Sequence, residues 1–487
     1  MIECCSNWGG ISAMSKIALL VTRDTSGLDS FSRKLGDLHG YQLLKVSSVM
    51  PEGLNHCEPV DFKQAREKLQ NGEVSLLVAN YFDPANVGRD FLSWKTALQA
   101  FDHEIADLIR SAAQMPHLTT VLGNPDLYAL AAGYLEKDDG VFTASFRMEQ
   151  ACNALHAVSQ FDASVAQYLE AQGGEVPDLD ALSGLPRTVT FSWKRSHSLP
   201  GGETPRQKAG LYGSYANHFE TVAGPEVDYR AVVDSSLAAH AIGEFEKTTA
   251  LITQRGALMS VASSDDLETA IEHAIEATES DLAGATLAVN ASMEGADIAK
   301  IDSIRFATFV APSFINSETL EGIRLLESRE GLGYEALQEL RSVVGGVLIQ
   351  DRNRSTVNPF SWRIPSANQP LVSDWETMIF GVRISRHLKS TSCLAVKGER
   401  IIAQASGLSH QRRFRQRLRE DEKSLGDSIL VFDEDIEDPD LLSEVKELGV
   451  TVVVHPGTAS SREGELVDRA NQLGLVLVTT GVSFTNF

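Results

Sequence analysis

Apolar runs bounded by turn residues alternate with helical patterns along almost the whole chain. The runs KIALLV and YQLLKV stand on either side of a helical pattern at residues 30–38. The runs at 75–82 and 119–126 enclose a second helical span near residues 97–113. Buried strands separated by helices are typical of a parallel sheet that carries helices on both faces. The pattern therefore predicts an α/β protein.

Two stretches rich in turn residues interrupt this alternation. A long amphipathic helix is predicted over 148–169, and the Gly-, Pro- and Asp-rich stretch 173–186 follows it. A second linker, with three prolines, runs over 353–370. Such stretches commonly lie between domains. We therefore predict a leader at 1–14, expected to be disordered, and α/β domains at 15–186, 187–365 and 366–487.

Net charge and cysteine content indicate which binding partners and which cellular compartment to expect. The chain of 487 residues carries 43 Lys+Arg against 66 Asp+Glu, a net charge of −23, which disfavours nucleic acid and anionic membrane surfaces. No apolar run approaches the roughly 20 residues that cross a bilayer. Five scattered cysteines, without paired metal-ligand spacing, are typical of a reducing compartment. We expect a cytoplasmic protein with no metal, no nucleic acid and no membrane partner.

The stretch GGETPRQKAGLYG, at 201–213, has neither a helical nor a strand pattern. Residues 199–209, LPGGETPRQKA, resemble the loop L-R-Y-G-E-N-P-H-Q-K-A of the AICAR transformylase/IMP cyclohydrolase family. Further matches follow in the same order: YRAVVDSSLAAHAIGEF, GGVLIQDRN, RHLKS and the closing GVTVVVHPGTASSREGELVDRANQLGLVLVTTG. The chain therefore resembles these bifunctional purine-biosynthesis enzymes from about residue 15 to residue 487.

This resemblance implies a specific architecture and reaction. It implies a methylglyoxal-synthase-like domain at 15–186, followed by two cytidine-deaminase-like α/β/α units that form the transformylase module. Members of the family transfer a formyl group from 10-formyltetrahydrofolate to the amine of AICAR, without a metal. Their transformylase site lies across a dimer interface, so the resemblance also implies a homodimer.

The motif for proton transfer departs from the family pattern K-H-x-N-P-x-G. The chain has TQRGALM at 253–259, so the Lys-His pair falls on Thr253-Gln254 or on Gln254-Arg255. The attacking amine must lose a proton, and the oxyanion of the intermediate needs a donor. Gln254 or Arg255 could stabilise that oxyanion, but neither is a base near neutral pH.

The groups that hold the substrate have changed as well. The loop arginine that binds the nucleotide phosphate in the family is Pro200 here, and its tyrosine neighbour is Gly201. The asparagine that contacts the base is Ala231, and the arginines of F-P-F-R-D and R-x-F-x-H are missing at 431–435 and 482–487. Because a phosphate dianion demands several charge-assisted donors, we do not expect AICAR to be the acceptor.

The first domain has lost its phosphate-binding motifs too. The family's S-D-K-T-G is RDTSG at 23–27, without the lysine. Its S-T-G-G-T is KVSSV at 45–49, without glycines whose amides could surround a phosphate. The segment D-G-R-V-K-T-L-H-P-K has no counterpart. We therefore expect that cyclohydrolase activity is lost.

The resemblance assigns candidate roles position by position. Catalytic roles fall on Thr253, Gln254, Arg255 and Lys389; substrate binding falls on Gly202, Glu203, Arg206, Gln207 and His387; cofactor binding falls on Ser390, Thr391, His410, Phe432 and Asp433. A structural alternative stands beside each set. The loop residues could close a turn on their own backbone, and His387 or Lys389 could complement a helix C-terminus.

Three functions remain open at this point. The first is a divergent formyltransferase that uses 10-formyltetrahydrofolate and an amine other than AICAR. The second is a non-catalytic paralogue that acts as a binding or scaffold subunit. The third is an authentic AICAR transformylase/IMP cyclohydrolase.

Overall fold

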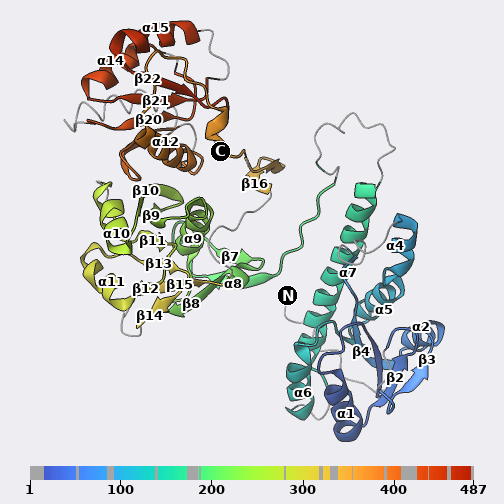
Figure 1. Ribbon diagram of the computed structural model, residues 1–487. Helices are drawn as coiled ribbons and strands as arrows, with labels where there is room; N and C mark the ends of the chain where they lie inside the picture. Colours follow the sequence, from blue (N-terminus) through green and yellow to red (C-terminus); the bar gives the residue numbers. More distant parts are fainter. Residues whose placement is uncertain are drawn as a thin grey trace. The chain divides into compact units, whose positions relative to one another are not determined.

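The computed structural model describes most of the chain, in two compact units, Met1–Ser192 and Trp193–Phe487 (Figure 1). The described residues are 16–50, 54–84, 93–137, 141–172, 185, 188–278, 281–316, 322–329, 338–353, 355–388, 392–406, 425–436, 438–457 and 462–483. The predicted leader at 1–14 lies outside them. Parallel strands and helices alternate in both units, so the predicted α/β class is confirmed.

The first unit is built on a five-stranded parallel sheet of order β3-β2-β1-β4-β5. Its strands are β1 (Ile17–Thr22), β2 (Gln42–Val46), β3 (Glu58–Val60), β4 (Val74–Asn80) and β5 (Thr120–Leu122). Every residue of β1 is buried, because helices cover both faces. The strand order reverses between β1 and β4, and the ends of these strands form a topological switch point.

Helices of the first unit make a separate core on each face of the sheet. They are α1 (Leu28–His39), α2 (Phe62–Gln70), α4 (Trp94–Ala100), α5 (His103–Ala113), α6 (Leu127–Lys137) and α7 (Ala144–Gln172). Side chains of α2, α5 and α7 enter one core, and those of α1 and α6 enter the other. Within the described part of the chain, no helix is long and apolar enough to cross a membrane.

The second unit contains a six-stranded and a five-stranded sheet, which share the order and direction of five strands; β8 is the additional strand of the first. The first has the order β10-β9-β11-β13-β15-β8, with β8 (Phe219–Ala223), β9 (Thr248–Gln254), β10 (Ala257–Ser264), β11 (Thr286–Val289), β13 (Thr308–Ala311) and β15 (Arg324–Ser328). The second has the order β19-β18-β20-β21-β22, with β18 (Ser392–Val396), β19 (Ile401–Ser406), β20 (Ile429–Phe432), β21 (Val452–His455) and β22 (Val476–Thr479). In each, a hairpin precedes an antiparallel strand and then further parallel strands.

The two sheets of the second unit meet at their hairpin edges, β10 and β19. Ala262 and Arg400 form an antiparallel bridge, and Ser263 N donates to Glu399 O at 2.8 Å. Gln404 Nε2 donates to Leu258 O at 3.0 Å. These bonds occupy edge groups that would otherwise be open to other strands.

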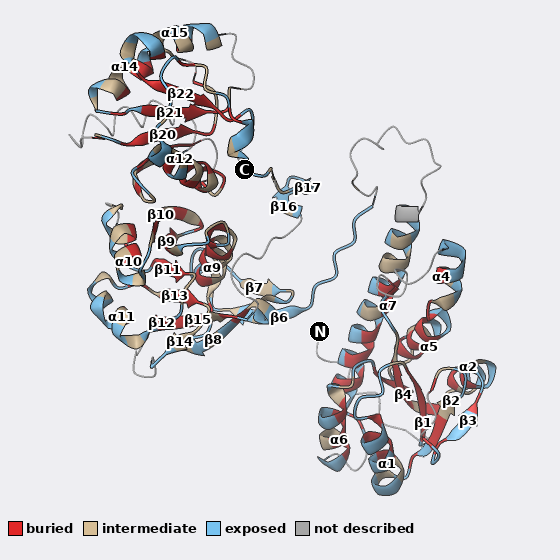
Figure 2. Ribbon diagram, viewed as in Figure 1, coloured by how far each residue is buried: buried red, intermediate tan, exposed pale blue. Residues whose placement is uncertain are grey.

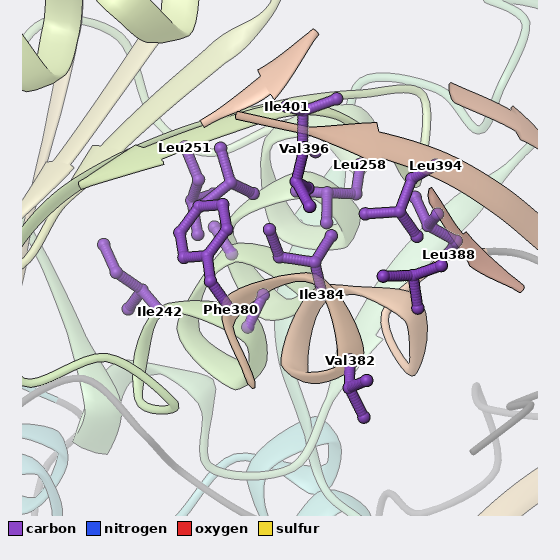
Figure 3. Close-up of a cluster of buried hydrophobic side chains, with 14 of the residues drawn as sticks. Ile242, Leu251, Leu258, Phe380, Val382, Ile384, Leu388, Leu394, Val396 and Ile401 are labelled. Carbon is purple, nitrogen blue, oxygen red and sulfur yellow. The ribbon is translucent and has the colours of Figure 1, made fainter. Parts of the chain in front are cut away.

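A shared apolar core holds the two sheets together under the helices α9 (Tyr229–Ile242) and α12 (Val372–Ser385). Figure 3 shows Leu251 and Leu258 of the first sheet beside Phe380 and Ile384 of α12. The rings of Phe245 and Phe380 lie 5.4 Å apart. The opposite faces are covered by α10 (Leu267–Glu276) and α11 (Gly295–Lys300), and by α14 (Asp440–Glu447) and α15 (Glu463–Leu473).

Small elements complete the second unit. They are the 3-10 turns η3 (Asp302–Ile304) and η4 (Pro359–Ser361), the helix α8 (Tyr215–His218), and the strand pairs β6 (Arg195–Leu199) with β7 (Ala209–Tyr212), β12 (Met293–Glu294) with β14 (Phe314–Ile315), and β16 (Gln338–Val343) with β17 (Gly346–Asp351). The expectation of no strand within 201–213 is wrong at its end, because residues 209–212 pair with β6.

The β16–β17 hairpin exposes an unusual amount of apolar surface (Figure 2). Its exposed apolar side chains are Leu340, Val343, Val344, Val347 and Leu348. Val344, at the tip, is fully exposed. An isolated two-stranded hairpin is marginally stable in water, so this surface is suited to a contact with another chain.

Gly381 marks a close approach between α12 and the second sheet. A Cβ there would lie 2.7 Å from Val431 Cγ2 and 3.2 Å from Val396 Cγ2. Both neighbours are stiff β-branched side chains. We therefore expect Gly381→Ala to lower the free energy of unfolding by about 1–3 kcal/mol, despite the better helix propensity of alanine.

Urea unfolding followed by circular dichroism measures this change. Gly464→Ala in α15 is the matched control, because nothing lies within 4 Å of the added methyl group. The control should be neutral or slightly stabilising. Equal unfolding midpoints for Gly381→Ala and the wild-type protein would contradict the packing described here.

Candidate functional site

The segment that replaces the family's Lys-His motif forms the end of β9 and a tight turn. Arg255 and Gly256 have φ values of 53° and 68°, so both lie in the left-handed region. Two such residues make the turn that suits a β-hairpin. Glycine adopts this conformation freely, whereas a side chain such as arginine costs roughly 1–2 kcal/mol there.

A buried carboxylate on α9 holds this turn. Asp234 Oδ1 accepts from Gly256 N at 2.6 Å, and Oδ2 accepts from Arg255 N at 3.1 Å. Asp234 is 2% exposed, and burial raises the pKa of its carboxyl group more than the two amide donors lower it. Thr253 Oγ1 donates to the backbone oxygen of Asp234 at 3.1 Å. The turn is therefore docked on α9 through both main-chain and side-chain groups.

The three predicted catalytic residues of this segment differ in their availability. Thr253 is fully buried and bonded to α9. Gln254 Nε2 donates to Asp281 O at 3.1 Å and to Ala283 O at 3.2 Å, so its amide holds the segment before β11. Arg255 is exposed, and its guanidinium contacts no partner among the residues that the structure describes. Arg255 alone has a side chain free for a ligand.

The predicted substrate loop closes on itself. Gln207 Oε1 accepts from Thr204 N at 2.9 Å, and Gly202 N donates to Gln207 O at 3.1 Å. These bonds match the structural alternative for Gly202 and Gln207. The side chains of Glu203 and Arg206 are exposed.

The loop and the turn lie at the same end of α9. Arg230 Nη2, in the first turn of α9, donates to Glu203 O at 3.2 Å. Asp234, four residues further along the same helix, binds the turn that carries Arg255. We call this cluster of Glu203, Arg230, Asp234 and Arg255 the turn site. The exposed Arg206 belongs to the same loop as Glu203.

A second cluster of charged groups lies beyond the other end of α9. Arg386 Nη1 donates to Glu244 Oε1 at 2.7 Å, and His387 Nε2 lies 3.5 Å from the same oxygen. Arg386 Nη2 also donates to Ser355 O. Burial alone would raise the pKa of Glu244, but His387 and Arg386 together hold it below its usual value.

Of the two described residues predicted to bind the cofactor, Phe432 and Asp433, only Asp433 joins this second cluster. Phe432 is a core residue at the end of β20, and the next residue, Asp433, donates through its amide to Ser392 O at 3.1 Å. Ser483 Oγ donates to Asp433 O at 2.8 Å, and Asn353 Nδ2 donates to Ser483 O at 3.1 Å.

We call this second cluster the α12 corner; it comprises Glu244, Asn353, Ser355, Arg386, His387, Asp433 and Ser483. The predicted residues Lys389, Ser390, Thr391 and His410 lie outside the described part of the chain.

The turn site and the α12 corner are separated by the length of α9. Asp234 and Glu244 are ten residues apart, which corresponds to roughly 15 Å along a helix axis. Within one chain, the described members of the predicted catalytic and cofactor-binding sets are therefore not brought into one cluster.

Sequence reasoning did not identify Glu244 or Asp234 as anchors of these clusters. Both lie in the segment YRAVVDSSLAAHAIGEF. The sequence feature that could have identified them is that they are acidic residues in an otherwise mostly apolar segment.

A small pocket of about 230 Å³ opens beside the corner, between α12 and the segment that follows α9. Phe245, Phe380 and Arg383 are among the residues that line it. Two other lining residues form an ion pair, with Lys247 Nζ 2.5 Å from Glu399 Oε2. Among the residues that the structure describes, no group of three or more His, Cys, Asp and Glu side chains could hold a metal ion.

At the switch point of the first unit, polar groups of the protein form hydrogen bonds and an ion pair with one another. Arg23 Nη2 lies 2.6 Å from Oδ1 of the buried Asp102, whose Oδ2 accepts from Phe82 N at 3.2 Å. Asn80 Oδ1 accepts from the amides of Arg23 and Asp24, each at 2.8 Å. The Arg23 guanidinium and the amides of Arg23 and Asp24, which could bind a phosphate at this edge, are thus already bonded to Asp102 and Asn80.

His387 makes the stability of the corner dependent on pH. Burial lowers the pKa of its imidazole, and Glu244 offsets only part of this effect. Below about pH 6.5 the unfolded chain therefore binds more protons than the folded chain, so the free energy of unfolding should rise as pH rises towards 6.5. In His387→Gln this rise should be smaller, whereas above about pH 7.5 the difference between the two proteins should be constant.

Urea unfolding at a series of pH values tests this expectation. His455, which is also buried with a lowered pKa, remains in the variant. Part of the slope should therefore persist. Identical slopes for His387→Gln and the wild-type protein would contradict the burial of a neutral imidazole at this position.

Comparisons with known proteins bear on the identity of the chain. A bifunctional purine biosynthesis protein, PurH, of Bacillus subtilis (strain 168) is 24% identical over 425 residues, which cover 84% of this chain and 80% of its own. The PurH of Cyanothece sp. (strain PCC 7425) is 24% identical over 517 residues, with 96% and 99% covered. A solved structure titled "Crystal structure of ForH" covers 32% of this chain and 98% of its own at 18% identity; its TM-score of 0.24 is too low to bear on the fold. The family described as AICARFT/IMPCHase bienzyme matches residues 112–414, and the chain belongs to this family.

Proposed function

We propose that the chain is a folate-dependent formyltransferase that moves a formyl group from 10-formyltetrahydrofolate to an amine other than AICAR. The observation that carries this proposal is the turn site. There the family's Lys-His position is replaced by a turn that Asp234 holds and that carries the unengaged guanidinium of Arg255.

The chemistry of the turn site fits oxyanion stabilisation better than base catalysis. In the proposed step, the amine nitrogen attacks the formyl carbon, and the bond from that carbon to N10 of the folate then breaks. The proton that the amine loses passes through solvent to the departing N10. Arg255 would donate hydrogen bonds to the oxyanion of the intermediate, since a guanidinium does not act as a base.

The absence of a strong base restricts the acceptor. An aliphatic amine is more nucleophilic than the aromatic amine of AICAR and needs less help from a base. The loop at 201–207 supports an acceptor without phosphate, because its ends are closed by Gln207 and Pro200 stands where the family has a phosphate-binding arginine.

A homodimer is part of this proposal. The turn site and the α12 corner are roughly 15 Å apart along α9, so a second chain could supply the α12 corner to a turn site. The exposed apolar side chains of the β16–β17 hairpin provide a surface for such a contact. We further propose that cyclohydrolase activity is lost, because Arg23 is paired with Asp102 and Asn80 binds two amides of the former phosphate loop.

An assay with 10-formyltetrahydrofolate and a panel of amines tests the proposal. Release of tetrahydrofolate is followed by absorbance, and formylated amines are detected by mass spectrometry. We expect turnover with a phosphate-free aliphatic amine and none with AICAR. Turnover with AICAR would favour the purine enzyme.

The competing function is a non-catalytic paralogue, which is favoured by the structural engagement of Thr253 and Gln254. It predicts no turnover with any amine. The PurH relatives carry purine biosynthesis in their names, so AICAR belongs in the panel as the reference acceptor.

Substitution of Arg255 tests its role as an oxyanion donor. We expect Arg255→Gln to lower kcat by about 100-fold and to change KM little, since one lost oxyanion donor commonly has this effect. Steady-state kinetics with the best amine measure both constants. Arg305→Gln is the matched control, because Arg305 is also an exposed, left-handed arginine in the same unit, with φ 62°. Equal kcat values for the two variants would remove Arg255 from the mechanism.

Charges on the β16–β17 hairpin test the dimer. We expect Val344→Asp with Leu348→Asp to shift the protein from dimer to monomer, because burying an unpaired carboxylate in an apolar contact is costly. Sedimentation velocity measures the change. Arg341→Gln on the same hairpin should leave the dimer intact, since it preserves the apolar side chains. A wild-type monomer, or an unaltered dimer in the double variant, would contradict this interface.

A further inference from the structure

Arg352 carries a positive charge that no residue in the described part of the chain neutralises. The residue follows β17 and is only partly exposed, and its Nε is buried without a hydrogen-bond partner. Its guanidinium forms no ion pair or hydrogen bond with any residue in the described ranges. Buried charges are normally paired, because removing a cation from water without a compensating partner is costly. Among the described residues, Arg352 therefore has no counterion, and its buried Nε has a free donor.

The contacts of the neighbouring residues place Arg352 at the edge of the α12 corner. Asn353 Oδ1 accepts from Ser355 N at 3.2 Å, and Ser355 O accepts from Arg386 Nη2. Burial is the main cause of the lowered pKa of His387, and the charge of Arg352 lowers it further. Asn353 and Ser355 therefore lie against the end of α12, and Arg352 directly precedes them.

The carboxylate already present in the corner is committed to other groups. Glu244 Oε1 accepts from Arg386 Nη1 at 2.7 Å and lies 3.5 Å from His387 Nε2. Arg386 uses a second nitrogen on Ser355 O. Glu244 is thus paired with Arg386 and lies beside His387, and no carboxylate of the described residues pairs with Arg352.

We propose that Arg352 binds a carboxylate group of a small-molecule ligand at the α12 corner, with Arg386 and His387 at the boundary of the site. A guanidinium presents a planar fork of donors that matches the two oxygens of a carboxylate. One unpaired guanidinium matches one negative charge, whereas a phosphate dianion demands several charged donors.

Identification of the ligand rests on the proposed function. In formyl transfer, the carboxylate belongs either to the glutamate part of the folate donor or to the acceptor amine. Both sources present the same group to Arg352, and the test separates them.

The first measurement is ligand-induced thermal stabilisation of the full-length protein, with succinate as a simple carboxylate probe and sodium chloride at the same ionic strength as the reference. We expect succinate to raise the Tm of the wild-type protein by about 2–4 °C over the reference and to leave Arg352→Gln unshifted. Arg341→Gln is the matched control, because Arg341 is an exposed arginine on the preceding hairpin. It should respond like the wild-type protein.

The second measurement is calorimetric titration with folic acid and with its diamide, in which both glutamate carboxylates are neutral. If the donor supplies the carboxylate, folic acid should bind the wild-type protein at least tenfold more tightly than the diamide does, and Arg352→Gln should bind both equally. If the acceptor supplies it, Arg352→Gln should bind folic acid as the wild-type protein does and lose only the response to succinate.

Two outcomes would overturn the inference. One is an equal response of Arg352→Gln and the wild-type protein to both succinate and folic acid. The other is a Tm of unliganded Arg352→Gln several degrees below that of the wild-type protein, together with a shift from dimer to monomer, since Arg352 would then pair with an acidic group of a second copy. If no amine is formylated but succinate and folic acid still act through Arg352 as expected, only the proposed formyl transfer is refuted, and the carboxylate site stands.

Discussion

The core shared by the two sheets of the second unit fixes helix α9 along its whole length. Ala238, Ala239 and Ile242 of α9 enter this core together with Met378 and Phe380 of α12. A helix held in this way cannot rotate or slide without breaking close apolar packing. The polar groups at its two ends are therefore set in place by burial in the middle. Both candidate clusters depend on this one constraint.

The described arginines differ in whether an acid pairs with them, and this difference decides which guanidinium groups are available. Arg23 is paired with a buried carboxylate at 2.6 Å, so the segment at 23–27 of the first unit has no free cation. Arg386 is likewise paired with Glu244. Arg255 and Arg352 contact no acid among the described residues. The position of an acid within hydrogen-bond distance, rather than the number of arginines, decides which guanidinium is available.

Most of the sheet pattern was accessible from the sequence. The apolar runs KIALLV and 75–82 largely coincide with the strands β1 and β4, whose side chains are mostly buried, and a continuous apolar run is typical of a strand that is buried on both faces. The shared topology of the two sheets was not accessible, because it rests on strand order and backbone direction, and no sequence repeat accompanies it. The strand at 209–212 was missed, since a short edge strand is specified by its partner β6.

The sequence by itself determined the family, the α/β class and the loss of the family's Lys-His pair and phosphate-binding arginines, because these are properties of residue type and order along the chain. The tertiary structure decided which of the remaining polar groups are committed. Gln254 holds a neighbouring segment, Gln207 closes its own loop, and Asp234 binds the turn of Arg255. Hydrogen bonds join residues that lie far apart in the sequence, and burial fixes their partners, so only the folded chain determines which side chains remain free.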